Sequence, residues 1–220
     1  MYGEPIQDVA PDQIERLSFT LIEREFQTET GIDPASIEPS RFRIIQRVIH
    51  ATGDFSFARS LVFHERAIEA GIESIRQGRP IVIDVTMGAA GISRSLLSAF
   101  GGSVICRIND AEIIDEARRH GRTRSDTALR RAAADDPGII AVGNAPTALL
   151  AVMEMIASGE MTPKLVIGVP VGFVNASESK EILMRQRYPF IANHGRKGGS
   201  PVAVATINAL LRLAHEQERL

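Results

Sequence analysis

Five short apolar runs, separated by segments with helical spacing, constrain the fold of this chain most strongly. They cover residues 81–85, 104–108, 139–142, 165–169 and 190–192. The runs are nearly continuous in apolar residues rather than alternating with polar ones, which is typical of strands covered on both faces. Because neighbouring parallel strands need a crossover connection, usually a helix, this order predicts a mainly parallel sheet.

The segments before and between these runs have helical periodicity or strong helix formers. They cover residues 11–26, a run that starts at Ser40, and residues 110–119, 125–134, 145–158, 177–187 and 201–215. No repeat or linker-like tract interrupts the 220 residues. We therefore expect one α/β domain over residues 1–220, a doubly wound, mainly parallel sheet of about five strands with helices on both faces.

Composition excludes several classes of partner. The net charge of -2 gives no electrostatic reason to expect nucleic acid or an acidic membrane surface as a ligand. No stretch approaches the roughly 20 apolar residues of a membrane span, and the N-terminal residues lack the pattern of a secretion signal, so a cytoplasmic protein is expected. The single Cys106 excludes an intramolecular disulfide and is expected to be a buried, inert thiol.

Several common catalytic motifs are missing. No GxGxxG follows a strand, and neither GxxxxGK[ST] nor GxSxG occurs, so dinucleotide, nucleoside triphosphate and serine hydrolase sites lose their usual support. The histidines show no HExxH or other metal-like spacing and have no cysteine partner. No protein-bound metal and no cofactor are expected.

The loops that follow the predicted strands are where a ligand is expected, because doubly wound sheets bind ligands outside the carboxyl ends of their strands. These loops cover residues 86–91, 143–147, 170–177 and 193–201, and all are rich in Gly, Pro, Asn, Ser or Thr. Residues 195–201 combine Arg196 and Lys197 with glycines and lead into the last helix. They are either an anion cradle or a glycine-rich turn with solvated charges.

Other loop residues also have two interpretations. Asn144 and its neighbouring amides either cap a helix or face a carboxylate. Ser177 is a plausible N-cap, and Phe173 either packs in the core or forms the wall of a site for a flat apolar ligand. Arg122 and Arg124 suit carboxylate binding but are equally well explained as a solvated face.

Two further residues stand out by position. Asp84 ends an apolar strand, so its carboxylate either accepts N–H groups of a neighbouring loop or contacts substrate. His50 ends an apolar helical run just before Gly53 and has polar residues close by. On its own it is explained by capping of the helix carboxyl end, although chemistry is often placed at such a junction.

Four segments, 47–54, 142–149, 168–181 and 195–201, together resemble the precorrin-8X methylmutase family, which includes the cobalt-precorrin-8 methylmutases. The likeness extends from the Leu17-Ser18-Phe19 helix to the last helix. It implies an isomerase of cobalamin biosynthesis that moves a methyl group from C11 to C12 of the macrocycle, giving hydrogenobyrinate or cobyrinate. It also implies a homodimer with a parallel α/β sheet, a cleft near the dimer interface that holds the tetrapyrrole, and hand-over to neighbouring corrin-pathway enzymes.

The resemblance assigns the catalytic histidine to His50, as proton donor. A histidine has an ordinary pKa of about 6.5 and can hold that proton near neutral pH. The candidate substrate contacts that the resemblance implies are Ser18, Thr86, Arg122, Arg124, Asn144, Thr147, Gly172, Phe173, Val174, Ser177, Arg196 and Lys197. Apolar walls with scattered donors would suit a flat ring that carries many carboxylates.

Two other functions remain open at this point. A non-catalytic tetrapyrrole carrier would use the same cleft to hold the product without converting substrate. A phosphate-binding or nucleotide-binding α/β enzyme is supported only by the glycine loop with Arg196 and Lys197.

Overall fold

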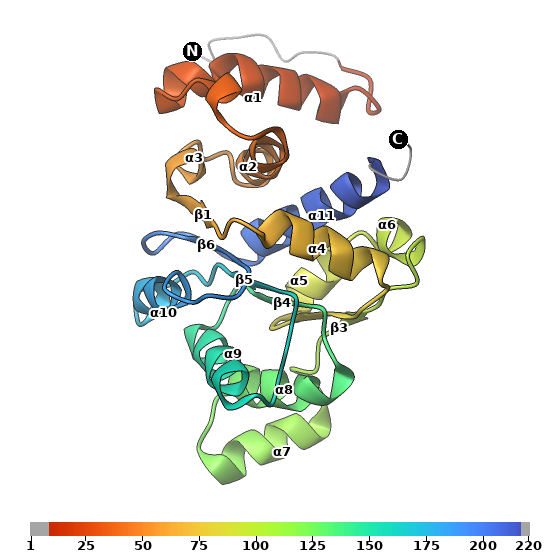
Figure 1. Ribbon diagram of the computed structural model, residues 1–220, viewed down its shortest axis with the longest axis vertical. Coiled ribbons are helices and arrows are strands. Elements are labelled where there is room, and N and C mark those ends of the chain that lie inside the picture. The colour runs from red at the N-terminus through yellow and green to blue at the C-terminus, as the bar shows by residue number, and fades with distance from the viewer. Residues whose placement is uncertain (1–8, 217–220) are drawn as a thin grey trace.

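Six strands form one sheet in the order β1-β6-β5-β4-β2-β3 in the computed structural model, which describes residues 9–216 (Figure 1). They are β1 (Leu61–Phe63), β2 (Ile81–Ile83), β3 (Val104–Ile105), β4 (Ile139–Val142), β5 (Leu165–Gly168) and β6 (Phe190–Asn193). All neighbours pair in parallel except β1 and β6, which are antiparallel. The predicted mainly parallel sheet is confirmed, with six strands in place of about five.

The strands are covered on both faces because successive side chains point to opposite sides of the sheet. In β2, Ile81 and Ile83 belong to one hydrophobic core and Val82 to the other. In β4, Ile139 belongs to the first core and Ile140 to the second. Two separate cores therefore explain why the runs contain apolar residues at nearly every position.

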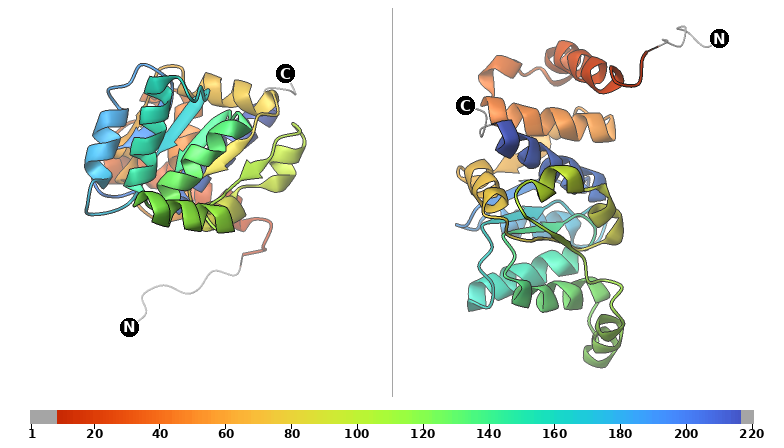
Figure 2. Two further views of the ribbon diagram at one scale, coloured as in Figure 1. Left: turned by 90° about the horizontal axis from the view of Figure 1, so that it is seen from below. Right: turned by 90° about the vertical axis from the view of Figure 1, so that its right-hand side faces the viewer.

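Helices form layers on either side of the sheet, as predicted (Figures 1 and 2). One face is covered by α4 (Ala67–Arg76), α5 (Thr86–Gly91), α6 (Arg94–Ser98) and α11 (Ser200–Glu216), with α2 (Pro39–Thr52) and then α1 (Ile14–Thr30) stacked outside them. The other face is covered by α7 (Ala111–His120), α8 (Arg124–Arg131), α9 (Pro146–Ser158) and α10 (Ala176–Leu183). A short α3 (Phe57–Ser60) leads into β1, and single 3₁₀ turns occupy Pro34–Ser36 and Ala132–Asp135.

The segment Thr86–Gly91 is helical, so its prediction as a loop is wrong. Its glycines suggested a turn, but close packing requires at least one of them. A Cβ added to Gly88 would lie 2.3 Å from Cδ1 of Ile83 in the neighbouring strand. The glycine lets this short helix pack against the end of β2.

The remaining differences concern element ends and short elements. The run 104–108 is strand only over Val104–Ile105, and the last predicted turns of 177–187 lie beyond the end of α10 at Leu183. Ser177 lies inside α10, whose N-cap is Asn175 in a left-handed conformation with φ 60, so the N-cap prediction for Ser177 is wrong. The short elements β1, α3 and α6 were not predicted, because few residues in each supply a periodic signal. The longer α4 was also missed, although Ile68, Ile72 and Ile75 have helical spacing.

The order of the strands reverses between β2 and β4. From β2 the chain continues to its neighbour β3, then crosses to β4 and proceeds outward through β5 and β6. In doubly wound sheets such a reversal leaves a crevice at the carboxyl ends of the two central strands. The edge of the sheet just after β2 and β4 is therefore the place to look for a site.

Across residues 9–216, no helix combines the length and the apolar composition that a bilayer crossing requires. Cys106 lies just beyond β3 and is half-buried rather than fully buried. Burial raises the pKa of its thiol, which keeps the sulfur protonated and weakly reactive.

Candidate active site

The antiparallel strand β1 brings the end of α2 to the carboxyl edge of the parallel strands. Leu61 pairs with Asn193, and the N–H of His194 donates to the carbonyl of Ser60 at 2.9 Å. Because β1 runs against β6, the residues before β1 lie beside the residues that follow β6. The chain from Gly53 to Ser60, directly after the helix that carries His50, therefore meets the glycine loop.

His50 lies in the last turn of α2 and is exposed. Its ring packs against Phe19 of α1, with ring centroids 5.1 Å apart and planes inclined by 52°. The helix ends through Gly53, whose N–H donates to the carbonyl of Ile49 at 2.7 Å. Within residues 9–216 the imidazole makes no hydrogen bond to a helix carbonyl, so His50 does not cap α2 directly, although its position in the last turn suits the helix dipole.

The turn of α1 that contains Ser18 is held against α2. The side-chain amide of Gln46 donates to the carbonyl of Phe19 at 3.0 Å, and the Arg47 guanidinium lies 4.8 Å from the Phe19 ring centroid. Arg47 also pairs with Glu15 at 2.8 Å, and this hydrogen bond lowers the pKa of Glu15. The Ser18 hydroxyl donates to the carbonyl of Ile14 at 2.8 Å, so Ser18 lies beside Phe19 with its hydroxyl hydrogen bonded inside its own helix.

The glycine loop is joined to the segment after α2 by Lys197. Its ammonium lies 2.6 Å from Oδ2 of Asp54 and 3.0 Å from the Ser56 hydroxyl. The hydrogen bond from Lys197 lowers the pKa of Asp54. The structure thus brings Lys197 and the His50 segment together, as an ion pair between two loops.

The loop after β5 lies against the same glycine loop. The N–H of Gly172 donates to the carbonyl of Arg196 at 3.1 Å, and the Arg196 guanidinium lies 5.3 Å from the ring centroid of Phe173. Phe173 is 83% exposed and Val174 77% exposed, so the core-packing interpretation of Phe173 is wrong. These side chains form an apolar surface next to a cation.

The loop after β4 is fixed by Asp84, which is fully buried at the end of β2. Its carboxylate accepts the N–H groups of Gly143 at 3.0 Å, Asn144 at 2.9 Å and Ala145 at 2.9 Å. Burial raises the pKa of Asp84, and the three N–H groups act in the opposite direction. The loop interpretation of Asp84 is therefore confirmed, and this carboxylate spans the point where the strand order reverses.

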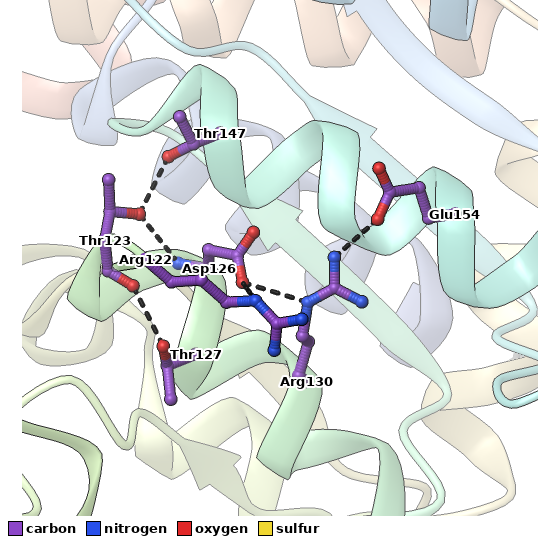
Figure 3. Close-up of polar contacts among 7 residues, drawn as sticks. All are labelled: Arg122, Thr123, Asp126, Thr127, Arg130, Thr147 and Glu154. Carbon is purple, nitrogen blue, oxygen red and sulfur yellow. Dashed lines mark hydrogen bonds and ion pairs between the residues drawn. The ribbon is translucent and has the colours of Figure 1, made fainter. Parts of the chain in front are cut away.

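Thr147 and Arg122 lie close to the start of α8 (Figure 3). The hydroxyl of Thr147 lies 2.9 Å from the hydroxyl of Thr123, which is the N-cap of α8. Arg122 lies 3.9 Å from Asp126, whose carboxylate also accepts a hydrogen bond from Arg130, and Arg130 in turn reaches Glu154.

The remaining predicted contacts lie at the first turns of helices. Arg124 is exposed and makes no ion pair with any residue that the structure describes. Thr86 is exposed at the start of α5, two residues beyond Asp84. Ser177 is half-buried in the first turn of α10.

Two side chains of this region, Phe19 and Lys180, were not singled out from the sequence. Phe19, which contacts His50, is one of many apolar residues in a helix, and no local pattern distinguishes it. Lys180 is fully buried, although lysine is rarely buried. Its signal was available, because α10 buries Ala176, Ser179, Lys180 and Leu183, a spacing that places the lysine on the apolar face.

This edge of the sheet presents a histidine, an exposed aromatic surface, separate cations and glycine-rich loops. Such a surface suits a flat, largely apolar ligand with several carboxylates. Among residues 9–216, no three His, Cys, Asp or Glu side chains come close enough to hold a metal ion.

Comparison with known proteins gives consistent matches. A family model described as precorrin-8X methylmutase matches residues 13–213. The cobalt-precorrin-8 methylmutase of Priestia megaterium is 45% identical over 207 residues, which cover 94% of this chain and 89% of that protein. The precorrin-8X methylmutase of Pseudomonas aeruginosa is 40% identical over 200 residues, which cover 90% and 93%. The crystal structure of the precorrin-8X methylmutase from Thermus thermophilus aligns with a TM-score of 0.83 at 38% identity, covering 94% of this chain and 97% of that chain.

Proposed function

The chain belongs to the precorrin-8X methylmutase family, and from this premise we propose that His50 is the proton donor of its reaction. The reaction is a methyl migration within precorrin-8X or its cobalt form, an isomerisation in cobalamin biosynthesis. Methylmutases are isomerases, so we propose neither the carrier nor the nucleotide-binding enzyme as the function of this chain.

A single proton donor is enough for the proposed reaction. Migration of a methyl group inside a conjugated ring needs no second substrate, and addition of a proton makes the ring system more electron-poor. The proton returns to the histidine when the product forms, so the isomerisation balances. General acid catalysis supplies roughly 10²–10⁴-fold, and holding the ring in a reactive shape must supply the remainder.

One observation carries the assignment to His50. The Lys197–Asp54 ion pair joins the segment just after His50 to the glycine loop that follows β6. A ring bound over the exposed Phe173 and the carboxyl ends of the central strands would lie next to that segment. Two other histidines are exposed: His120 ends α7, and His194 follows β6 in the same loop, where its ring pairs with Glu181 at 2.8 Å.

The proposed substrate contacts lie on the loops and helices around the carboxyl ends of the parallel strands. Arg124 and Arg196 would meet ring carboxylates, and Arg122 would do so after exchanging its long contact with Asp126. Lys197 would use the third N–H of its ammonium, because the other two point to Asp54 and Ser56. Phe173 and Val174 would pack on the ring face. The other proposed contacts are Ser18 in α1, Asn144 and Gly172 in loops, and Thr86, Thr147 and Ser177 in the first turns of helices.

The assembly and location are proposed on the same premise. We expect a homodimer whose cleft lies near the interface, working in the cytoplasm and passing its product to other corrin-pathway enzymes. The free thiol of Cys106 fits a reducing compartment. Sedimentation of the purified protein would test the dimer.

The activity is tested with the purified chain and two substrates, precorrin-8X and its cobalt form. Methyl migration leaves the mass of the tetrapyrrole unchanged and shifts its visible spectrum toward that of a corrin. Conversion of either substrate supports the proposal, and the ratio of the two rates identifies the preferred one. Binding of both without any conversion would indicate a carrier and overturn the proposal.

A further inference from the structure

Lys180 on α10 is a fully buried lysine with neutral partners only. Its ammonium donates to the carbonyl of Lys197 at 2.7 Å and to Oδ1 of Asn193 at 3.3 Å. No carboxylate of residues 9–216 lies within ion-pair distance of it. Burying an ammonium costs free energy that two neutral acceptors offset only in part, so its presence here calls for an explanation.

The two acceptors of Lys180 are themselves connected. Asn193 is fully buried at the end of β6, and its side-chain amide donates to the same carbonyl of Lys197 at 2.7 Å and to the carbonyl of His194 at 3.1 Å. Two buried side chains thus converge on one carbonyl of an otherwise exposed loop. Their effect is to fix the main chain at Lys197.

The fixed main chain continues into a contact with the segment after α2. The ammonium of Lys197 lies 2.6 Å from Asp54, and Asp54 follows Gly53, the residue that ends α2. A series of contacts therefore runs from Lys180 through the main chain and side chain of Lys197 to Asp54, four residues from His50.

We propose that Lys180 is a positioning residue for substrate binding: by fixing the Lys197 main chain, it holds the glycine loop in register with the helix end that carries His50. Lys180 is buried and does not touch the ring. It acts through Lys197, and this inference rests on the proposed function of His50 and the glycine loop.

The charge of Lys180 agrees with this role. Burial lowers the pKa of Lys180 to about 8, and the neighbouring Glu181 acts in the opposite direction. The side chain is therefore mostly cationic at neutral pH. A cation behind the loop adds to the positive potential at Arg196 and Lys197, where carboxylates of the substrate would bind.

Lys180→Met tests the proposal, because methionine fills similar space without a donor or a charge. We expect KM to rise about tenfold while kcat changes less than about twofold, since ordering of the loop affects binding more than chemistry. The thermal midpoint should change little, because the loss of a desolvated ammonium is offset by leaving the buried Oδ1 of Asn193 without its donor. Lys164→Met is the matched control: Lys164 lies just before β5, at the opposite edge, and pairs at 3.6 Å with Glu73.

A double-mutant cycle with Asp54→Asn separates positioning from a general loss of structure. If both residues act through Lys197, Asp54→Asn alone also raises KM, and the double variant is no worse than the worse single one. An unchanged KM in Lys180→Met, or single effects that multiply in the double variant, would overturn the proposal. If Lys180→Met does not fold, Lys180→Gln replaces it in the cycle with the same two outcomes.

The proposal and the function on which it rests fail in different ways. If the wild-type chain converts neither substrate, the proposed function fails. If the wild-type chain is active and KM does not respond to Lys180, only the positioning role fails.

Discussion

The ring of Phe19 lies against the imidazole of His50, with centroids 5.1 Å apart, so a residue of α1 sets the surroundings of a side chain on α2. The Arg47 guanidinium packs against the same Phe19 ring. The orientation of the proposed proton donor therefore depends on how the two outer helices α1 and α2 pack against each other.

Replacing the imidazole should slow catalysis strongly and leave the fold intact. His50→Asn is expected to lower kcat by roughly 10²–10⁴-fold, the usual contribution of a general acid. The side chain is exposed, so the thermal midpoint and the affinity for product should change little. His120→Asn, an exposed change at the end of α7, is the control. A His50→Asn enzyme with wild-type kcat would refute the acid role.

Removing the charge of Asp84 should destabilise the fold. In Asp84→Asn an amide N–H faces at least one of the three main-chain N–H groups that the carboxylate accepts, which leaves buried donors unpaired. We expect a loss of about 3 kcal/mol in the free energy of unfolding, measured with denaturant. Asp115→Asn, at an exposed position of α7, should lose much less. Equal losses in the two variants would contradict the bracing role of Asp84.

The Lys197–Asp54 pair should give a pH-dependent contribution to stability. Hydrogen bonding to Lys197 holds the pKa of Asp54 below its ordinary value of 3.8. A depressed carboxyl pKa stabilises the folded state above the unfolded pKa, and this contribution is lost as the pH falls through the folded pKa. Lys197→Met should therefore be less stable than wild type by about 0.5 kcal/mol near pH ~6, because the pair is partly exposed, and the difference should vanish near pH ~2. A difference that grows as the pH falls would have the wrong sign.

Two glycines of the same loop should respond differently to alanine. Gly198 has φ 150, and a Cβ there would lie 2.3 Å from the carbonyl oxygen of Val169, so the main chain would have to move. Gly195 has φ 75 with nothing within 4 Å of its Cβ position, and only the backbone preference is lost. Gly195→Ala should cost about 1 kcal/mol of unfolding free energy, and Gly198→Ala clearly more, with a higher KM. The reverse order would show that the loop is not packed in this way.

The exposed Phe173 should matter for ligand binding and not for folding. It is 83% exposed, so Phe173→Ala should leave the thermal midpoint nearly unchanged. If the ring packs on the macrocycle, the affinity for the corrin product should fall by about tenfold or more, measured by absorbance titration. Ile182→Ala, at a position 44% exposed on α10, serves as control. Unchanged product affinity would place the macrocycle elsewhere.

The sequence predicted the parallel core of the fold because its strands are apolar at nearly every position and its long helices are periodic. The residues of β4 were predicted without error, at 139–142. The sequence did not predict β1, since Leu61–Phe63 is too short to carry a periodic signal and forms a strand only through its pairing with β6. That missing strand is the one that brings the His50 segment to the proposed site.

Individual side chains were predictable only where position alone determines the role. A buried carboxylate at a strand end needs hydrogen-bond donors, and Asp84 accepts them from the loop after β4. The pairing of Lys197 with Asp54, 143 residues apart in the chain, depends on the tertiary fold and has no local signature. Residue spacing in α10 could have identified Lys180 as buried, but not the carbonyl that it contacts.

The antiparallel strand β1 is attached to β6 through three residue pairs only. Short edge strands open at lower free energy than the interior of a sheet. Opening of this strand would release the chain from Asp54 to Ser60 from the glycine loop, while α2 kept its buried residues in the core that it shares with α11. The proposed site would thus be built from two well-packed parts of the fold whose connection is less stable than either part.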